Sequence, residues 1–168
     1  MFKVGDRVIH NSFGLCRISA IGKEDAYSGR EDCYIFYIEK TKIIIPVAHA
    51  DILRYPMKKE EVPTVFEALE NVEAMPSEMS YRNFVDAYTK RMSSNNVSEI
   101  ASCLRDLTFL NEKSTLKGPA KNLLETINKI LVDEISFIKN ISRVEAQRLI
   151  SRSLSKAKER IKCSTKKQ

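Results

Sequence analysis

The side chains of this 168-residue sequence with the greatest capacity for chemistry are two histidines and four cysteines. They are His10, His49, Cys16, Cys33, Cys103 and Cys163. Imidazole nitrogens and thiolates bind zinc when their spacing brings three or four together, and an activated thiolate is a nucleophile. The cysteines lie far apart and form no C-x-x-C pair. We therefore expect no metal site, no disulfide framework and no cysteine nucleophile, and we expect a reducing, cytoplasmic environment.

Phosphate-binding loops and acid–base pairs are also missing. None of the five glycines belongs to a G-x-G-x-x-G or G-x-x-x-x-G-K-[ST] stretch, which would cradle a phosphate. The carboxylates of 70–75 and 106–114 have the spacing of solvated helix faces rather than of a catalytic pair. The sequence therefore predicts no enzyme activity and no cofactor.

The basic residues gather in one part of the chain. The net charge is +6, and the segment 139–168 holds ten Lys and Arg against two Asp and Glu. The segment 58–138 holds ten against thirteen. This asymmetry is typical of contact with a polyanion, and we select Arg152, Lys156 and Arg160 as candidate phosphate contacts. A solvated terminal helix would produce the same pattern, and both interpretations stay open.

The apolar residues predict a globular chain outside the membrane. Hydrophobic residues make up 43% of the sequence, and the mean hydropathy is −0.30. No apolar run approaches the roughly 20 residues that a membrane span needs. The first residues lack the long apolar core of a signal peptide. We expect a cytoplasmic protein with no membrane partner.

The elements that position these residues change along the chain. Residues 2–54 contain short β-branched and aromatic runs separated by turns, at 2–10, 14–21, 33–38, 42–47 and 50–54. Their spacing predicts a small β-barrel or a strongly bent sheet, in a domain over 1–57. Apolar residues then recur at helical spacing in five segments: 62–75, 77–92, 95–110, 118–138 and 142–161. The sequence thus predicts an α+β protein whose second domain, 58–168, is an all-helical bundle.

The run Lys42-Ile43-Ile44-Ile45-Pro46 is a candidate docking strand. Proline cannot donate a ladder hydrogen bond, so this strand is expected at a sheet edge. An apolar edge strand invites pairing with another chain, in which backbone hydrogen bonds supply affinity. The alternative is that Pro46 only ends an internal strand.

Several stretches, taken in order, resemble the CarD/CdnL transcription regulators. "FKVGDRVIHNSFGLCRISAI" and "YIFYIEKTKIIIPVAHADILR" are similar to the N-terminal module, which is shared with the transcription-repair coupling factor. "VSEIASCLRDL" and "KSTLKGPAKNLLETINKILVDEIS" are similar to the helical part. The resemblance implies that a Tudor-like or SH3-like barrel docks by strand pairing on the RNA polymerase β-subunit. It also implies that the helical domain contacts promoter DNA and stabilises the open complex without catalysis.

The resemblance also implies site residues. On the polymerase side they are Lys42, Ile43, Ile44, Ile45, Pro46 and the loop residue Glu24. The family places a Trp wedge in the DNA minor groove at the bubble edge, and Tyr81 occupies that position in this Trp-free chain. Arg82, Lys90, Arg91 and Lys121 are its basic neighbours, available for phosphates. The alternative is that Tyr81 packs inside the bundle.

Three functions remain open. The first is a CarD-like regulator with the polymerase β-subunit and promoter DNA as partners, acting as a monomer. The second is a polymerase-binding adaptor whose helices meet another protein. The third is a Tudor-like peptide-binding scaffold outside transcription.

Overall fold

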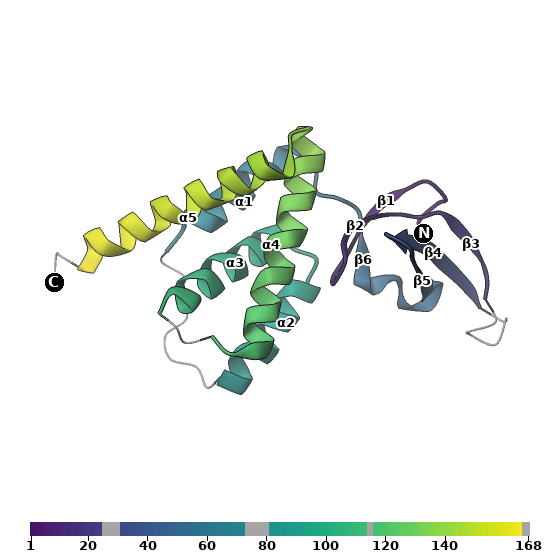
Figure 1. Cartoon of the computed structure of the whole chain (residues 1–168), viewed down its shortest axis with the longest axis horizontal. Coiled ribbons are helices and arrows are strands. Elements are labelled where there is room, and N and C mark those ends of the chain that lie inside the picture. Colours follow the sequence, from purple (N-terminus) through teal and green to yellow (C-terminus); the bar gives the residue numbers. More distant parts are fainter. Residues whose placement is uncertain (25–30, 73–80, 114–115, 166–168) are drawn as a thin grey trace. The chain divides into compact units, whose positions relative to one another are not determined.

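The computed structural model describes residues 1–24, 31–72, 81–113 and 116–165, with the backbone alone at 81–84, 93 and 164–165. The chain divides into two compact units, Met1–Pro56 and Met57–Gln168 (Figure 1). The first unit is built from strands and the second from helices. The predicted α+β class is confirmed.

Six strands and the 3-10 helix η2 form the described part of the first unit. They are β1 (Arg7–His10), β2 (Gly14–Arg17), β3 (Ala20–Lys23), β4 (Asp32–Ile38), β5 (Thr41–Pro46), η2 (Val47–Ile52) and β6 (Leu53–Arg54). Two antiparallel three-stranded sheets result, with the orders β2-β1-β6 and β3-β4-β5. The described strands therefore make two sheets rather than a closed barrel, which was one of the two arrangements that the sequence predicted.

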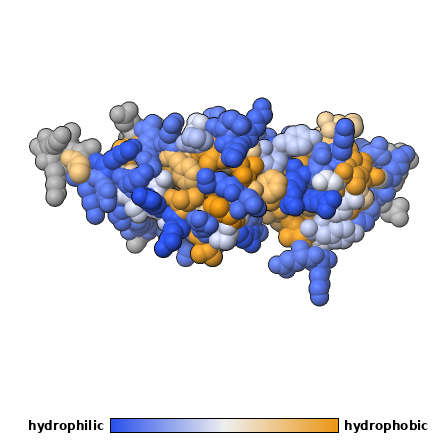
Figure 2. All heavy atoms as spheres, turned by 90° about the horizontal axis from the view of Figure 1, so that it is seen from above, coloured by the Kyte–Doolittle hydropathy of each residue, from blue (hydrophilic) through white to orange (hydrophobic). Residues whose placement is uncertain are grey.

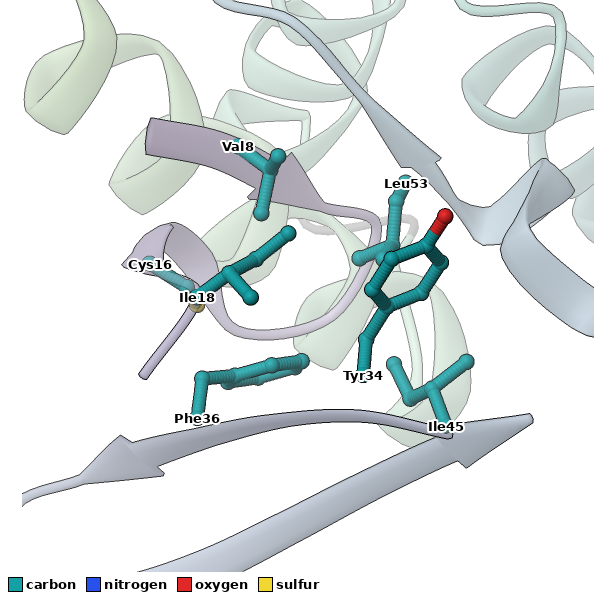
Figure 3. Close-up of a cluster of buried hydrophobic side chains, with 7 residues drawn as sticks. All are labelled: Val8, Cys16, Ile18, Tyr34, Phe36, Ile45 and Leu53. Atoms are coloured by element: carbon teal, nitrogen blue, oxygen red, sulfur yellow. The ribbon is translucent and has the colours of Figure 1, made fainter. Parts of the chain in front are cut away.

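The core of the first unit lies where side chains of both sheets meet (Figure 3). Its buried members are Val8, Cys16, Ile18, Tyr34, Phe36, Ile45 and Leu53. Successive side chains of a strand point to opposite faces, so every second residue of β4 and β5 reaches this core. Partly buried residues such as Phe2, Ile38 and Ile43 also pack against this small cluster.

Five α-helices and a short 3-10 helix form the described part of the second unit. They are η3 (Lys59–Glu61), α1 (Val62–Glu70), α2 (Tyr81–Ser93), α3 (Val97–Glu112), α4 (Gly118–Lys139) and α5 (Arg143–Thr165). α1 and α4 each pack against both α3 and α5, while α2 packs on α3 and α4. Val65, Leu69, Leu104, Ile127 and Leu131 are buried among them. The expected helical bundle is confirmed.

Side-chain and backbone caps set the helix ends. The Asn96 side chain accepts hydrogen bonds from the backbone N–H groups of Ser98 and Glu99 and so caps the start of α3. Asn140 adopts a left-handed conformation, with φ 52°, and ends α4. The Ser142 hydroxyl then accepts from the Glu145 N–H at 3.1 Å and starts α5. These caps make the α4–α5 turn short.

The first helix ends earlier than the sequence indicated. The apolar pattern extends to residue 75, but α1 stops at Glu70 because Asn71 has an extended backbone with φ −80° and ψ 115°. Val72, which the apolar pattern placed in this helix, therefore lies beyond its end. Residues 73–80, which include the start of the predicted 77–92 helix, lie outside the described part of the chain.

Candidate functional site

The strand β5 lies at an edge of its sheet. Among the described residues it pairs with β4 alone. Pro46 pairs with Cys33, and a proline is tolerated where the ladder needs no donor, so this is a non-hydrogen-bonded pair. Such pairs alternate with hydrogen-bonded ones, so Ile44 and Lys42 belong to the same class as Pro46. Their main-chain N–H and C=O groups therefore point toward the open edge.

The two faces of β5 differ in what they contact. Ile43 and Ile45 lie on the inner face, where Ile45 belongs to the core and Ile43 packs against it. Ile44 lies on the outer face, directly across the ladder from Ile35. Ile35 is buried, Ile44 is half-buried, and the neighbouring Tyr37 is 54% exposed. The outer face beside the open edge therefore combines these apolar side chains with Lys42, which lies two residues from Ile44 on the same face.

The only charged side chain of β5 has an internal partner. Lys42 Nζ donates to Glu24 Oε1 at 2.8 Å. This hydrogen bond raises the pKa of Lys42 above its usual range. The resemblance assigns both residues to polymerase contact, whereas the structure pairs them with each other. Together they present a neutral pair next to Ile44.

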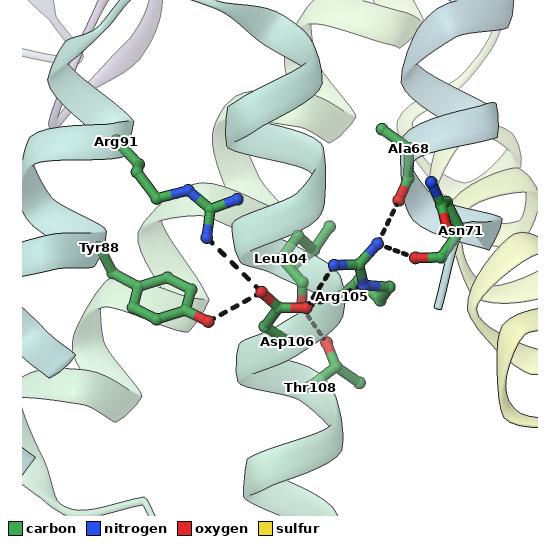
Figure 4. Close-up of polar contacts among 8 residues, drawn as sticks. All are labelled: Ala68, Asn71, Tyr88, Arg91, Leu104, Arg105, Asp106 and Thr108. Carbon is green, nitrogen blue, oxygen red and sulfur yellow. Dashed lines mark hydrogen bonds and ion pairs between the residues drawn. The ribbon is translucent and has the colours of Figure 1, made fainter. Parts of the chain in front are cut away.

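The second unit contains a buried charged cluster at the sequence "LRDL" (Figure 4). The Asp106 carboxylate accepts from Arg105 Nε at 2.8 Å and Nη2 at 2.6 Å, and from the Tyr88 hydroxyl at 2.8 Å. Arg91 Nη1 lies 3.6 Å from the same carboxylate, and its guanidinium stands 5.2 Å from the centre of the Tyr88 ring. We call these four residues the Asp106 cluster. The interpretation of the 106–114 carboxylates as a solvated face is wrong for Asp106, which is fully buried.

Arg105 extends the Asp106 cluster to a third helix. Its Nη1 donates to the carbonyl oxygen of Ala68 at 2.9 Å and also to that of Asn71. A cation at a helix C-terminus satisfies unpaired carbonyls and interacts favourably with the helix dipole. The cluster therefore joins the end of α1 to α2 and α3. Burial, together with the Asp106 charge, raises the pKa of Tyr88, and burial raises the pKa of Cys103 to about 12.

Acidic side chains of α1, α3 and α4 bind basic side chains of the helix α5. Glu70 on α1 accepts from Ser153 and Lys156, both at 2.9 Å, and lies 3.4 Å from Arg160. The hydrogen bond from Lys156 is the main reason why the pKa of Glu70 lies below its usual range. Elsewhere along α5, Arg143 bonds to Asp133 and Lys158 to Glu112. Glu70 is thus not the solvated carboxylate that the sequence indicated.

The other residues expected at the DNA are in several places. Tyr81 and Arg82 lie in the first turn of α2, and their side chains are outside the described part of the chain. Lys90, Lys121 and Arg152 are exposed. Figure 2 shows hydrophilic side chains around the C-terminal end of the helical unit. The structure therefore brings Lys156 and Arg160 together at Glu70, and Arg91 to Asp106.

The histidines and cysteines do not form a metal site in the described residues. No group of three or more His, Cys, Asp or Glu side chains suitable for a metal occurs there. His10 is buried, and its Nδ1 accepts from the backbone N–H groups of Ser12 and Phe13. This pattern gives His10 a role in the β1–β2 turn, and burial lowers its pKa. Within the same described part of the chain, no helix is long and apolar enough to cross a membrane.

Comparisons with known proteins match both units. The model of the CarD-like/TRCF RID domain matches residues 2–57, and that of the CarD C-terminal domain matches residues 64–151. The chain belongs to the CarD family. It is also 20% identical over 149 residues to "Putative transcription factor YdeB" of Bacillus subtilis (strain 168), covering 84% of this chain and 95% of that relative. The resemblance seen in the sequence is confirmed.

The extent of the CarD match separates the candidate residues. The Asp106 cluster, Tyr81 and Lys121 lie inside the C-terminal match, whereas Arg152, Lys156 and Arg160 lie just beyond its end at residue 151. The sequence analysis used "VSEIASCLRDL" for the family resemblance but missed that its Arg105 and Asp106 are buried partners. An Arg-Asp pair flanked by leucines on a helical face was the available signal, because a charged pair between core positions must satisfy itself internally.

Proposed function

We propose that this CarD family protein binds the β-subunit of bacterial RNA polymerase through β5 and stabilises the open promoter complex with its helical unit. The observation that carries the polymerase part is the open edge of β5, where the main-chain groups of Lys42 and Ile44 point outward beside the apolar side chains of Ile44 and Ile35. A strand added there gains backbone hydrogen bonds and buries apolar area. The proposal places the protein in the cytoplasm, where polymerase works.

The DNA part of the proposal assigns the contact to the start of α2. Tyr81 would act as an aromatic wedge at the upstream edge of the bubble, with Arg82, Lys90 and Lys121 on the phosphates. A wedge of this kind stabilises unstacked base steps without any chemical reaction. The protein would therefore act as a binding factor with promoter DNA and polymerase as its partners.

An alternative is favoured by the ion pairs of the helical unit. Arg91 contacts Asp106, and Lys156 and Arg160 contact Glu70, so three expected DNA contacts already have acidic partners. This supports an adaptor whose helices meet another protein.

Two measurements test these functions in order. Co-purification of the full chain with core RNA polymerase is expected, and its failure would leave only the peptide-binding scaffold. Footprinting of the polymerase–promoter complex with and without the protein then separates regulator from adaptor. The regulator extends protection or lengthens the open-complex lifetime at the upstream bubble edge, whereas the adaptor changes neither.

A further inference from the structure

The outer face of β5 indicates which kind of side chain a partner segment can place opposite Ile44, a property that the proposed docking alone does not specify. A residue placed directly across the open edge from Ile44 has its side chain on the same face of the extended sheet as Ile44. That face contains Ile44, the buried Ile35, the partly exposed Tyr37 and Lys42, which is paired with Glu24. The arriving side chain would therefore meet the apolar Ile44, with the Lys42–Glu24 pair two residues away along the strand.

Charge cannot take the place of apolar contact at this position. Lys42 is the only ionisable side chain on β5, and it is hydrogen-bonded to Glu24 at 2.8 Å. A partner carboxylate would have to displace Glu24 to gain Lys42, and a partner cation would have to displace Lys42 to gain Glu24. Burying an unpaired charge against Ile44 and Ile35 would be costly. Both signs of charge are disfavoured for the same physical reason.

We infer that β5 selects an extended partner segment with an aliphatic or aromatic side chain opposite Ile44, and that this position is recognised by apolar burial rather than by an ion pair. The inference rests on the proposed docking to the polymerase β-subunit and names the chemistry of the segment that docks. Backbone hydrogen bonds along the edge hold the segment, and the Ile44 position decides which segment is accepted.

Replacement of Ile44 by an acidic and by a basic residue tests the inference. Ile44→Glu and Ile44→Lys in the full chain are both expected to weaken binding to core RNA polymerase about tenfold or more, since each replaces burial of an isoleucine by burial of a charge. Ile44→Leu is expected to bind within about threefold of the native chain, because it keeps the apolar volume.

Two controls separate recognition from folding. Ile21 is 39% exposed on β3, at the opposite edge of the same sheet, so Ile21→Glu and Ile21→Lys add the same charges without touching β5. They are expected to leave polymerase binding unchanged. If thermal unfolding shows that the charged Ile44 variants do not fold, Ile44→Thr keeps a β-branched strand residue and is expected to weaken binding in the same direction.

A salt series gives an independent result. Apolar recognition predicts that the affinity of the native chain for core polymerase changes little between about 0.05 and 0.3 M salt. Opposite effects of Ile44→Glu and Ile44→Lys, or a steep loss of affinity with salt, would overturn the inference while leaving polymerase docking intact. Equal binding by all Ile44 variants would also overturn it. A native chain that does not bind polymerase would overturn both the inference and the proposed function.

Discussion

The two units of this protein present opposite kinds of surface to a partner. In the first unit the candidate interface is a strand edge with outward main-chain groups, an apolar face and a single charged side chain that is already paired. In the second unit the candidate interface consists of cations, several of which bind acidic residues of the same unit. Charge in the sequence is therefore a poor guide to the surface that a partner meets.

The charge asymmetry of the sequence has a structural explanation in this comparison. The acidic residues of 58–138 supply Glu70, Glu112 and Asp133, and the basic residues of α5 bind them. The buried residues of α5 are Ile150 and three small side chains, Ala146, Ser153 and Ala157. Ion pairs and hydrogen bonds therefore add to apolar packing in holding α5 on the bundle.

The largest expected effect is a loss of stability of the helical unit, while the strand unit is expected to stay folded. Asp106→Ala removes the carboxylate that binds Arg105, Tyr88 and Arg91, and leaves the Arg105 guanidinium, which is 1% exposed, without its ion-pair partner. Breaking a buried pair in this way costs about 3–5 kcal/mol. Urea unfolding followed by helical circular dichroism measures the loss of stability.

The matched control for this change is Tyr88→Phe. It removes one hydrogen bond to the same carboxylate but keeps the ion pair, so the expected loss of stability is about 1 kcal/mol. Equal losses in the two variants would mean that the ion pair does not stabilise the bundle.

The second effect separates the two units by function. Tyr81→Ala is expected to shorten the open-complex lifetime about tenfold, because aromatic stacking on a base is worth roughly 1–3 kcal/mol. Polymerase affinity is expected to stay constant, since β5 is unchanged. Promoter-complex dissociation kinetics and polymerase co-purification make the two measurements. An unchanged lifetime in a folded variant would favour packing of Tyr81 inside the bundle.

The third effect concerns the basic helix. Replacing Arg152, Lys156 and Arg160 by Gln is expected to lower the salt dependence of DNA binding by up to about 0.9 log units for each phosphate that the variant no longer neutralises. The weakening is expected to be similar across DNA sequences, because phosphates carry no base information. Glu70→Gln offers the opposite test, since it removes the carboxylate charge that pairs with Lys156 and Arg160 and should steepen the slope. Identical slopes in all three proteins would make α5 a purely structural helix.

The smallest effect is a pH dependence at Glu70. Its pKa is lowered in the folded chain, chiefly by the hydrogen bond from Lys156, so its contribution to stability is present above its unfolded pKa of about 4.3. That contribution is lost as the pH falls through the folded pKa. A pH series of unfolding free energies for native and Glu70→Gln chains is expected to converge below about pH 4. Parallel curves would contradict the role of this ion pair.

The sequence predicted the element types better than the positions of the charges. Helical periodicity located the second unit, and Pro46 located the edge strand, because both are local properties of a few neighbouring residues. Glu70 and Asp106 were misread because their partners lie far away in sequence or on other helices. Ser153 and Glu70 are 83 positions apart, and Ala68 and Arg105 are 37 apart. Only the tertiary fold brings such residues together.

The bond between Glu70 and Ser153 has a consequence for how the chain is made. A ribosome adding about 5–20 residues per second completes Ser153 roughly 4 to 17 s after Glu70. During that interval α1 has no α5 to pack against, and the side of the bundle that α5 covers stays open. A nascent chain in this state exposes apolar surface to chaperones and proteases, and α5 ends the exposure when it closes the bundle.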